Sequence, residues 1–107
     1  LYTITFDLPY TDEDQPQYIS LNTELVCTKK VAIYGSANQT IILRANFTNK
    51  PLLSLKAAGS LVSNLHFENY ATGITLESAN YVDESNQNNW AKIERCTFHS
   101  SHSTALA

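Results

Sequence analysis

The sequence predicts an all-β chain wound as a solenoid of stacked strands. Three observations predict it: short runs of alternating apolar and polar residues, polar turns between those runs, and a pattern that returns about every 30 residues. Alternation with a period of two is typical of strands with one buried face, and helical spacing of apolar residues is nearly absent. The 107 residues fit one domain. Residues 1–30 would hold the N-terminal strands and the first coil, and residues 31–107 the repeating coils.

Turn-forming residues separate the strand-like runs along the chain. Pro9 and the acidic segment Thr11-Asp12-Glu13-Asp14 follow the first run, Gly35 and Ser36 follow the fourth, and a long polar loop covers residues 78–89. Many short strands with polar turns indicate a sandwich, a barrel or a solenoid. The predicted strands are residues 2–6, 18–21, 25–27, 31–34, 40–43, 52–55, 61–67, 73–76 and 91–98, with the start of another at 104–106.

An internal repeat favours the solenoid. When residues 61–69 are placed over residues 92–100, three apolar positions coincide at a separation of 31 residues: Val62 with Ile93, Leu65 with Cys96, and Phe67 with Phe98. The start of the same unit recurs at residues 31–35, where Ile33 lies 29 residues before Val62. Each unit is followed by a further short strand, which we place at residues 40–43, 73–76 and 104–106.

The period of the repeat has a physical meaning. Three short strands with their turns use roughly 25–30 residues, which is one turn of a coiled sheet, and equivalent strands then stack about 4.8 Å apart. A sandwich gives no reason for the phase to recur. The residues expected in buried columns are Ile33, Val62, Leu65, Phe67, Ile74, Ile93 and Phe98.

Several segments carry a resemblance to a known family. The segments are Phe6-Asp7-Leu8-Pro9, Ile19-Ser20-Leu21, Leu25-Val26-Cys27-Thr28, Val31-Ala32-Ile33-Tyr34-Gly35 and Leu65-His66-Phe67-Glu68-Asn69. They resemble the opening coils of the pectin lyase-like superfamily, including its large surface-exposed adhesin-type members. The resemblance implies a right-handed parallel β-helix of about three coils. Because the chain starts in a strand and stops without a polar tail, we expect a piece of a longer helix.

The motifs that carry this resemblance specify a coil and no chemistry. Enzymes of the superfamily place carboxylates in phase on the outer face of neighbouring coils, whereas Glu94 is the single acid among the outward strand positions of residues 61–67 and 91–98. The acidic residues 12–14 could hold Ca²⁺, but a solvated turn explains them more simply. His99 and His102 lack a converging third ligand. We therefore predict no catalytic, cofactor or metal site in this segment.

Two pairs of residues are candidates for surface contacts. Tyr81 and Trp90 flank the polar loop, and aromatic rings beside amides could stack on a sugar or contact a partner; packing against the coil is the simpler explanation. Asn38 and Asn46 begin N-glycosylation sequons, which favour a secreted or cell-surface protein.

The cysteines are expected to stay unpaired. Cys27 and Cys96 lie among alternating apolar residues, which predicts buried free thiols. In the proposed register they belong to different strands of distant coils, too far apart for a disulfide.

We predict that partners bind by adding strands to the edges of the sheets. No charged or Pro-rich residues that would prevent pairing follow the last strands, residues 91–98 and 104–106, whereas Pro9, the acids 12–14 and Pro16 interrupt pairing near the start. Partners would be other protein chains or further coils of the same chain, with carbohydrate as a second class. The net charge of −3 argues against nucleic acid, and no apolar run approaches the roughly 18 residues of a membrane span.

The function that these features favour is an extracellular structural or adhesive segment, without catalysis of its own, that presents loops or assembles into a longer surface structure. The alternative is the N-terminal part of a carbohydrate-active enzyme, a polysaccharide lyase or glycoside hydrolase, with catalytic coils beyond Ala107.

Overall fold

The computed structural model describes residues 2–6, 15–76, 91–99 and 104–106, and these form twelve β-strands and no helix. All of the paired strands run parallel. The strands are β1 (Tyr2–Ile4), β2 (Gln17–Leu21), β3 (Leu25–Cys27), β4 (Val31–Tyr34), β5 (Ile41–Ala45), β6 (Pro51–Leu55), β7 (Leu61–Ser63), β8 (His66–Glu68), β9 (Thr72–Leu76), β10 (Lys92–Glu94), β11 (Thr97–His99) and β12 (Thr104–Leu106).

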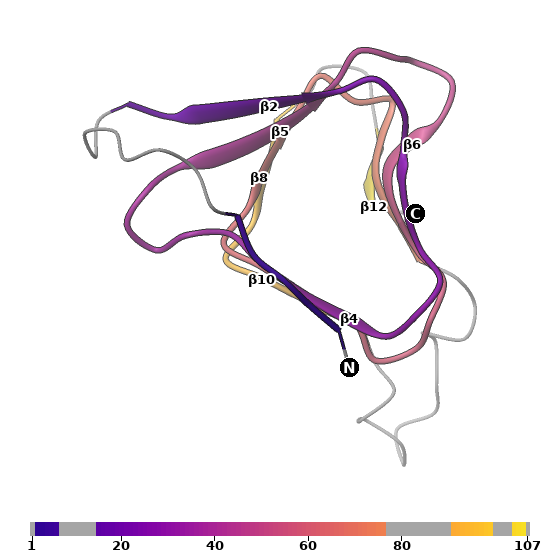
Figure 1. Cartoon of the computed structure of the whole chain (residues 1–107). Coiled ribbons are helices and arrows are strands. Elements are labelled where there is room, and N and C mark those ends of the chain that lie inside the picture. The colour runs from indigo at the N-terminus through magenta and orange to yellow at the C-terminus, as the bar shows by residue number, and fades with distance from the viewer. Residues whose placement is uncertain (1, 7–14, 77–90, 100–103, 107) are drawn as a thin grey trace.

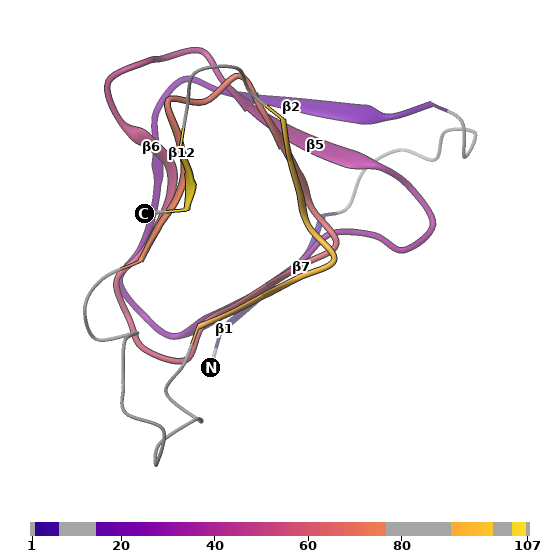
Figure 2. The ribbon, with the colours of Figure 1, turned by 180° about the vertical axis from the view of Figure 1, so that it is seen from behind.

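The strands enter three sheets in rotation. Sheet A has the order β1-β4-β7-β10, sheet B the order β2-β5-β8-β11, and sheet C the order β3-β6-β9-β12. We call each set of three successive strands a rung, so that β1–β3 form rung 1 and β10–β12 form rung 4. In Figures 1 and 2 the sheets make three sides of a ring, with the rungs stacked one behind another. The predicted all-β class is confirmed, in a parallel β-helix-like arrangement.

Two predicted strands are each divided by a corner. Residues 61–67 form β7 and β8, and residues 91–98 contain β10 and β11. Asn64 and Arg95 lie at the corners with φ of 58° and 51°, a left-handed conformation that turns the chain out of an extended path. The prediction of single strands was wrong because polar residues at these positions also fit the outer face of a strand.

The expected phase of residues 40–43 was also wrong. They were matched to residues 73–76, but β5 pairs with β8 in sheet B, and β9 pairs with β6 in sheet C. A six-residue connection, 35–40, joins β4 to β5, whereas two residues join β7 to β8. Because the longer connection moves β5 further along the sequence, the residue spacing matched it to β9 of sheet C, although it belongs to sheet B.

Three rows of apolar residues run through the stack, one in each sheet. Within a row, successive residues are direct strand partners, as predicted for Ile33 with Val62, Val62 with Ile93, and Phe67 with Phe98. The rows, from rung 1 to rung 4, are Ile4-Ile33-Val62-Ile93 in sheet A, Ile19-Leu43-Phe67-Phe98 in sheet B, and Leu25-Leu53-Ile74-Leu106 in sheet C.

Burial within these rows depends on the rung. Ile33, Val62, Leu65, Phe67 and Ile74 are buried, as expected. The other two predicted core residues, Ile93 and Phe98, are only partly buried, although both pack against the core. They lie on β10 and β11, each of which has a neighbour on one side only among the described strands. The sequence pattern identified their row but not how fully each position in it would be covered.

Close backbone contact joins rungs 2 and 3 at one corner. The Gly35 N–H donates to the Ser63 carbonyl oxygen at 2.8 Å. A Cβ on residue 35 would lie 1.8 Å from the Asn64 carbonyl oxygen, so no other residue fits without a backbone shift. The corner also positions the loop of residues 35–40, which borders one of the candidate sites below.

Candidate functional site

The two faces at which the stack of described strands stops are the first candidate site. At one face β1, β2 and β3 each have a single neighbouring strand, β4, β5 and β6, and at the other face β10, β11 and β12 have the single neighbours β7, β8 and β9. A strand edge of this kind presents main-chain N–H and C=O groups that can pair with a further strand. We call these the rung 1 face and the rung 4 face.

The rung 1 face is the more apolar of the two. Five large hydrophobic side chains are exposed there: Tyr2 (62%), Tyr18 (48%), Val26 (47%), Ile4 (39%) and Leu25 (38%). On the strands of rung 4 only Leu106, at 45%, belongs to this class of exposed residue. The expectation that Pro9, the acids 12–14 and Pro16 interrupt pairing near the start stays a prediction, because Pro9 and the acids 12–14 lie outside the described residues.

A cavity opens into the core at the rung 1 face. It has a volume of about 270 Å³. Ile4, Phe6, Leu25, Val26 and Cys27 line it together with deeper residues of rungs 2 and 3, including Leu43 and Leu65. A hollow with apolar walls over an apolar core favours hydrophobic side chains as its occupant.

A polar groove of about 400 Å³ is the second candidate site. It lies between the loop of residues 35–40 and the corner at Asn64, and its lining is Ser36, Ala37, Asn38, Gln39, Thr40, Asn64 and His66. Ser36 Oγ accepts the N–H groups of Asn38 (3.1 Å) and Gln39 (3.2 Å), which shapes the loop. Sequence reasoning missed the groove because its two walls are brought together only by the stacking of rungs 2 and 3.

The groove has the chemistry of a hydrogen-bonding site. Its lining offers amide, hydroxyl and imidazole groups, and none of the seven lining residues is a Lys, Arg, Asp or Glu. The Nδ1 atom of His66 shares a hydrogen bond with the Thr97 hydroxyl of the next rung, which ties the ring to β11. Such a lining suits a neutral, hydroxyl-rich ligand better than an anion or a cation.

Both sequon asparagines are exposed. Asn38 lies in the groove-lining loop. Asn46 follows β5, and its Nδ2 donates to Asn22 Oδ1 at 3.1 Å, across two adjacent rungs. Glycosylation of these residues stays a prediction. Among the described residues, the side-chain amide of Asn46 takes part in a hydrogen bond between rungs, and that of Asn38 does not.

The remaining predicted surface residues are not described. Tyr81 and Trp90 lie outside the described residues, as do the acids 12–14 and His102. Across residues 2–6, 15–76, 91–99 and 104–106, no three His, Cys, Asp or Glu side chains group into a metal site. The described carboxylates are those of Glu24, Glu68 and Glu94, and no strand register places one opposite another.

The cysteines are free thiols, as predicted, but they are half-buried where burial was expected. Cys27 lies on β3 in rung 1, and Cys96 lies at the corner between β10 and β11. Burial raises the pKa of the Cys27 thiol. Burial is also the main reason why the pKa of the Cys96 thiol is raised, and the charge of Glu94 adds to the effect. Their positions in the outer rungs explain the incomplete burial.

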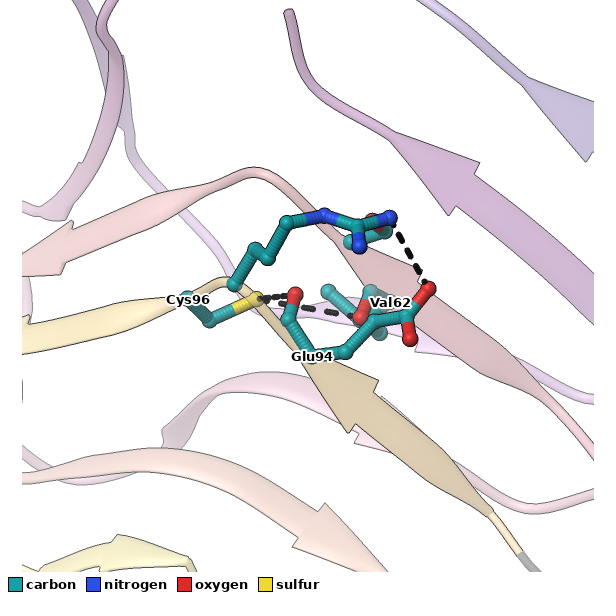
Figure 3. Close-up of polar contacts among 5 residues, drawn as sticks. Val62, Glu94 and Cys96 are labelled. Carbon is teal, nitrogen blue, oxygen red and sulfur yellow. Dashed lines mark hydrogen bonds and ion pairs between the residues drawn. The ribbon is translucent and has the colours of Figure 1, made fainter. Parts of the chain in front are cut away.

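Figure 3 shows how Cys96 sits against rung 3. Its sulfur lies 3.3 Å from the Glu94 carbonyl oxygen and 3.7 Å from that of Val62. Arg95 extends the corner outward, with an ion pair to Glu94 at 3.2 Å and a hydrogen bond to Ser63 Oγ at 3.4 Å. Raised pKa values keep both thiols protonated near neutral pH, so the arrangement serves packing better than nucleophilic chemistry.

Comparison with known proteins finds no match to this chain, whether among family models, curated proteins or solved structures. Among the described residues there is no helix with the length and apolar character needed to cross a membrane.

Proposed function

We propose that this chain is a structural or adhesive segment of a right-handed parallel β-helix of the pectin lyase-like kind, working at the cell surface or as a secreted protein. The segment extends through the edges of its sheets and carries loops outward, without catalysis of its own. One observation supports the proposal most: within the described part of the chain all three sheets stop at the same two faces, and one face exposes five large hydrophobic residues.

Extension of the stack would cover the strand edges and the exposed apolar residues of the described strands. Exposed edges and large exposed apolar patches are aggregation hazards, which proteins normally cover. Another rung placed on either face would satisfy the main-chain groups of three strands and bury the apolar rows together. Extension of the stack is therefore the activity that the described surface favours.

The test is the mass of the chain in solution. We expect light scattering on the 107-residue chain to give masses that rise with concentration above the 11.9 kDa of the monomer. A monodisperse 11.9 kDa species at the highest attainable concentration would contradict the proposal.

Carbohydrate contact at the polar groove is a second candidate function. The seven-residue lining, with its amide and hydroxyl groups and no charge, supports it. We expect neutral oligosaccharides to shift the NMR resonances of Asn38 and His66. An Asn38→Ala variant should weaken these shifts, while the control Asn46→Ala, outside the groove, should leave them unchanged. Equal responses of the two variants would reject the groove as the site. The enzyme alternative, with catalytic coils beyond Ala107, has no comparable support from the described residues.

A further inference from the structure

We propose that an N-linked glycan on Asn38 occupies the polar groove and so closes it to free ligands. The inference rests on the proposed secreted or cell-surface location, because N-linked glycans are added in the secretory pathway, and it concerns the groove of the second candidate function. Its first support is position: all three residues of the sequon, Asn38, Gln39 and Thr40, line the groove. The acceptor residue therefore lies in the wall of a hollow that can hold a small ligand.

The loop that carries this sequon is fixed at both ends to the neighbouring rungs. At its start the Gly35 N–H donates to the Ser63 carbonyl oxygen of rung 3 at 2.8 Å, and at its end the Thr40 carbonyl oxygen accepts the Gln17 N–H of rung 1 at 2.8 Å. Between these anchors Ser36 Oγ accepts two N–H groups of the loop. The wall of the groove is thus formed before any ligand arrives, which lowers the entropy cost of holding a sugar against it.

The two sequons differ in what their acceptor side chains do. Asn38 is exposed, and within the described part of the chain its side-chain amide takes part in no hydrogen bond. Its Nδ2 atom can therefore carry a sugar without breaking a contact among these residues. Asn46 Nδ2 donates to Asn22 Oδ1, and no residue of the Asn46 sequon lines the groove. The chain therefore provides its own comparison, with one sequon in the groove and one outside it.

The chemistry of the groove suits the sugar that glycosylation would attach. An N-linked glycan begins with an N-acetylated sugar, whose hydroxyl and amide groups are uncharged. Across the groove from the sequon lie the Asn64 amide and the His66 imidazole, and the volume of about 400 Å³ is within the roughly 300–1,000 Å³ of small-ligand sites. Because the sugar is tethered, its effective concentration at the groove is high, so weak hydrogen bonds suffice to hold it there.

The attachment is a group transfer from a lipid-linked oligosaccharide diphosphate. Asn38 Nδ2 forms a bond to the anomeric carbon of the first sugar and loses one proton to a base of the host transferase. The bond from that carbon to the lipid diphosphate breaks, and the diphosphate leaves with the bonding electron pair. Once attached, the sugar competes with a free oligosaccharide for the same lining, so we expect carbohydrate binding from the unglycosylated form only.

Two variants with a single sequon test the inference. Thr48→Ala leaves Asn38 as the acceptor, and Thr40→Ala leaves Asn46. Each variant is prepared glycosylated, by secretion from cells that add N-linked glycans, and unglycosylated, from bacteria, so that every glycosylated form is compared with the same sequence. Mass spectrometry measures occupancy and circular dichroism checks folding, and Asn38→Gln replaces Thr40→Ala if the latter does not fold.

We expect the glycan to shift the NMR resonances of Asn64 and His66 in Thr48→Ala and to leave them unchanged in Thr40→Ala. Shifts caused by a free neutral oligosaccharide should be lost when Asn38 is glycosylated. An unmodified Asn38 in secreted Thr48→Ala, a glycan that leaves both resonances unchanged, or equal shifts in the two variants would overturn the inference.

The failure of the proposed functions has separate signs. If a free oligosaccharide does not bind the unglycosylated chain, carbohydrate contact at the groove is rejected, while the shifts caused by the attached glycan still decide this inference. Light scattering on the unglycosylated chain bears on the structural function alone.

Discussion

Rung 3 and rung 4 contain the same pattern of residues but meet different surroundings. Phe67 and Phe98 are direct strand partners, with rings stacked at a centroid distance of 4.9 Å and an angle of 7°. Phe67 has no exposed surface, whereas Phe98 is only partly buried. The difference comes from the neighbours, since β8 lies between β5 and β11, while in the described part of the chain β11 pairs with β8 only. In a stacked fold, the position of a rung determines how much stability a given residue contributes.

Removing the two aromatic rings should give the largest contrast. Phe67→Ala should lower the free energy of unfolding by about 3–5 kcal/mol, because it leaves a cavity between two rungs. Phe98→Ala should lower it clearly less, because its ring is partly in solvent already. Urea unfolding followed by circular dichroism measures both. Equal losses would show that the two rungs are equally enclosed, contrary to the structure.

The glycines at close contacts should show the same contrast on a smaller scale. Gly35→Ala would bring a Cβ within 1.8 Å of the Asn64 carbonyl oxygen, between rungs 2 and 3. Overpacking of this kind typically costs about 1–3 kcal/mol. At Gly73 the Cβ would lie 2.6 Å from the Ala105 carbonyl oxygen, on the outer strand β12. Because β12 pairs with β9 only among the described strands, a small shift of β12 should be cheaper than one at rungs 2 and 3. We therefore expect Gly73→Ala to cost less, and thermal unfolding of both variants tests the order.

The corner residues allow a subtler comparison. Asn64 and Arg95 both adopt left-handed conformations, which Asn tolerates better than most residues. We expect Asn64→Ala to lower stability by about 1 kcal/mol. Arg95→Asn should leave stability unchanged or raise it, since its ion pair with Glu94 is exposed and contributes little. A large loss on replacing Arg95 would show that its contact with Ser63 matters more than the backbone strain.

The smallest expected effect is a pH dependence from the two thiols. Burial raises the pKa of Cys27 and Cys96 above the ordinary thiol value, so the folded chain holds these protons more tightly than the unfolded chain. Their contribution to stability is therefore complete below about pH 8.5 and is lost as the pH rises toward the folded pKa values. Urea unfolding at pH 7 and 9.5 should show this decline. A Cys27→Ala, Cys96→Ala double variant, which lacks both thiols, should show a smaller one.

The sequence by itself determined the strands and the rows. Alternation with a period of two is local, so it located most strands within a residue or two, and the spacing of 31 residues identified Val62 with Ile93 and Phe67 with Phe98 as neighbours. Stacking equal phases is the only step needed to turn that spacing into contacts.

The tertiary structure alone decided the corners, the phase of β5, the groove and the extent of burial. The alternation of apolar and polar residues does not reveal the left-handed backbone conformation of Asn64 and Arg95, because a polar residue fits both a corner and the outer face of a strand. The groove joins the 35–40 loop to Asn64 and His66 across two rungs, which no local pattern records. Burial of a row depends on strands above and below it, so identical residues such as Phe67 and Phe98 end in different surroundings.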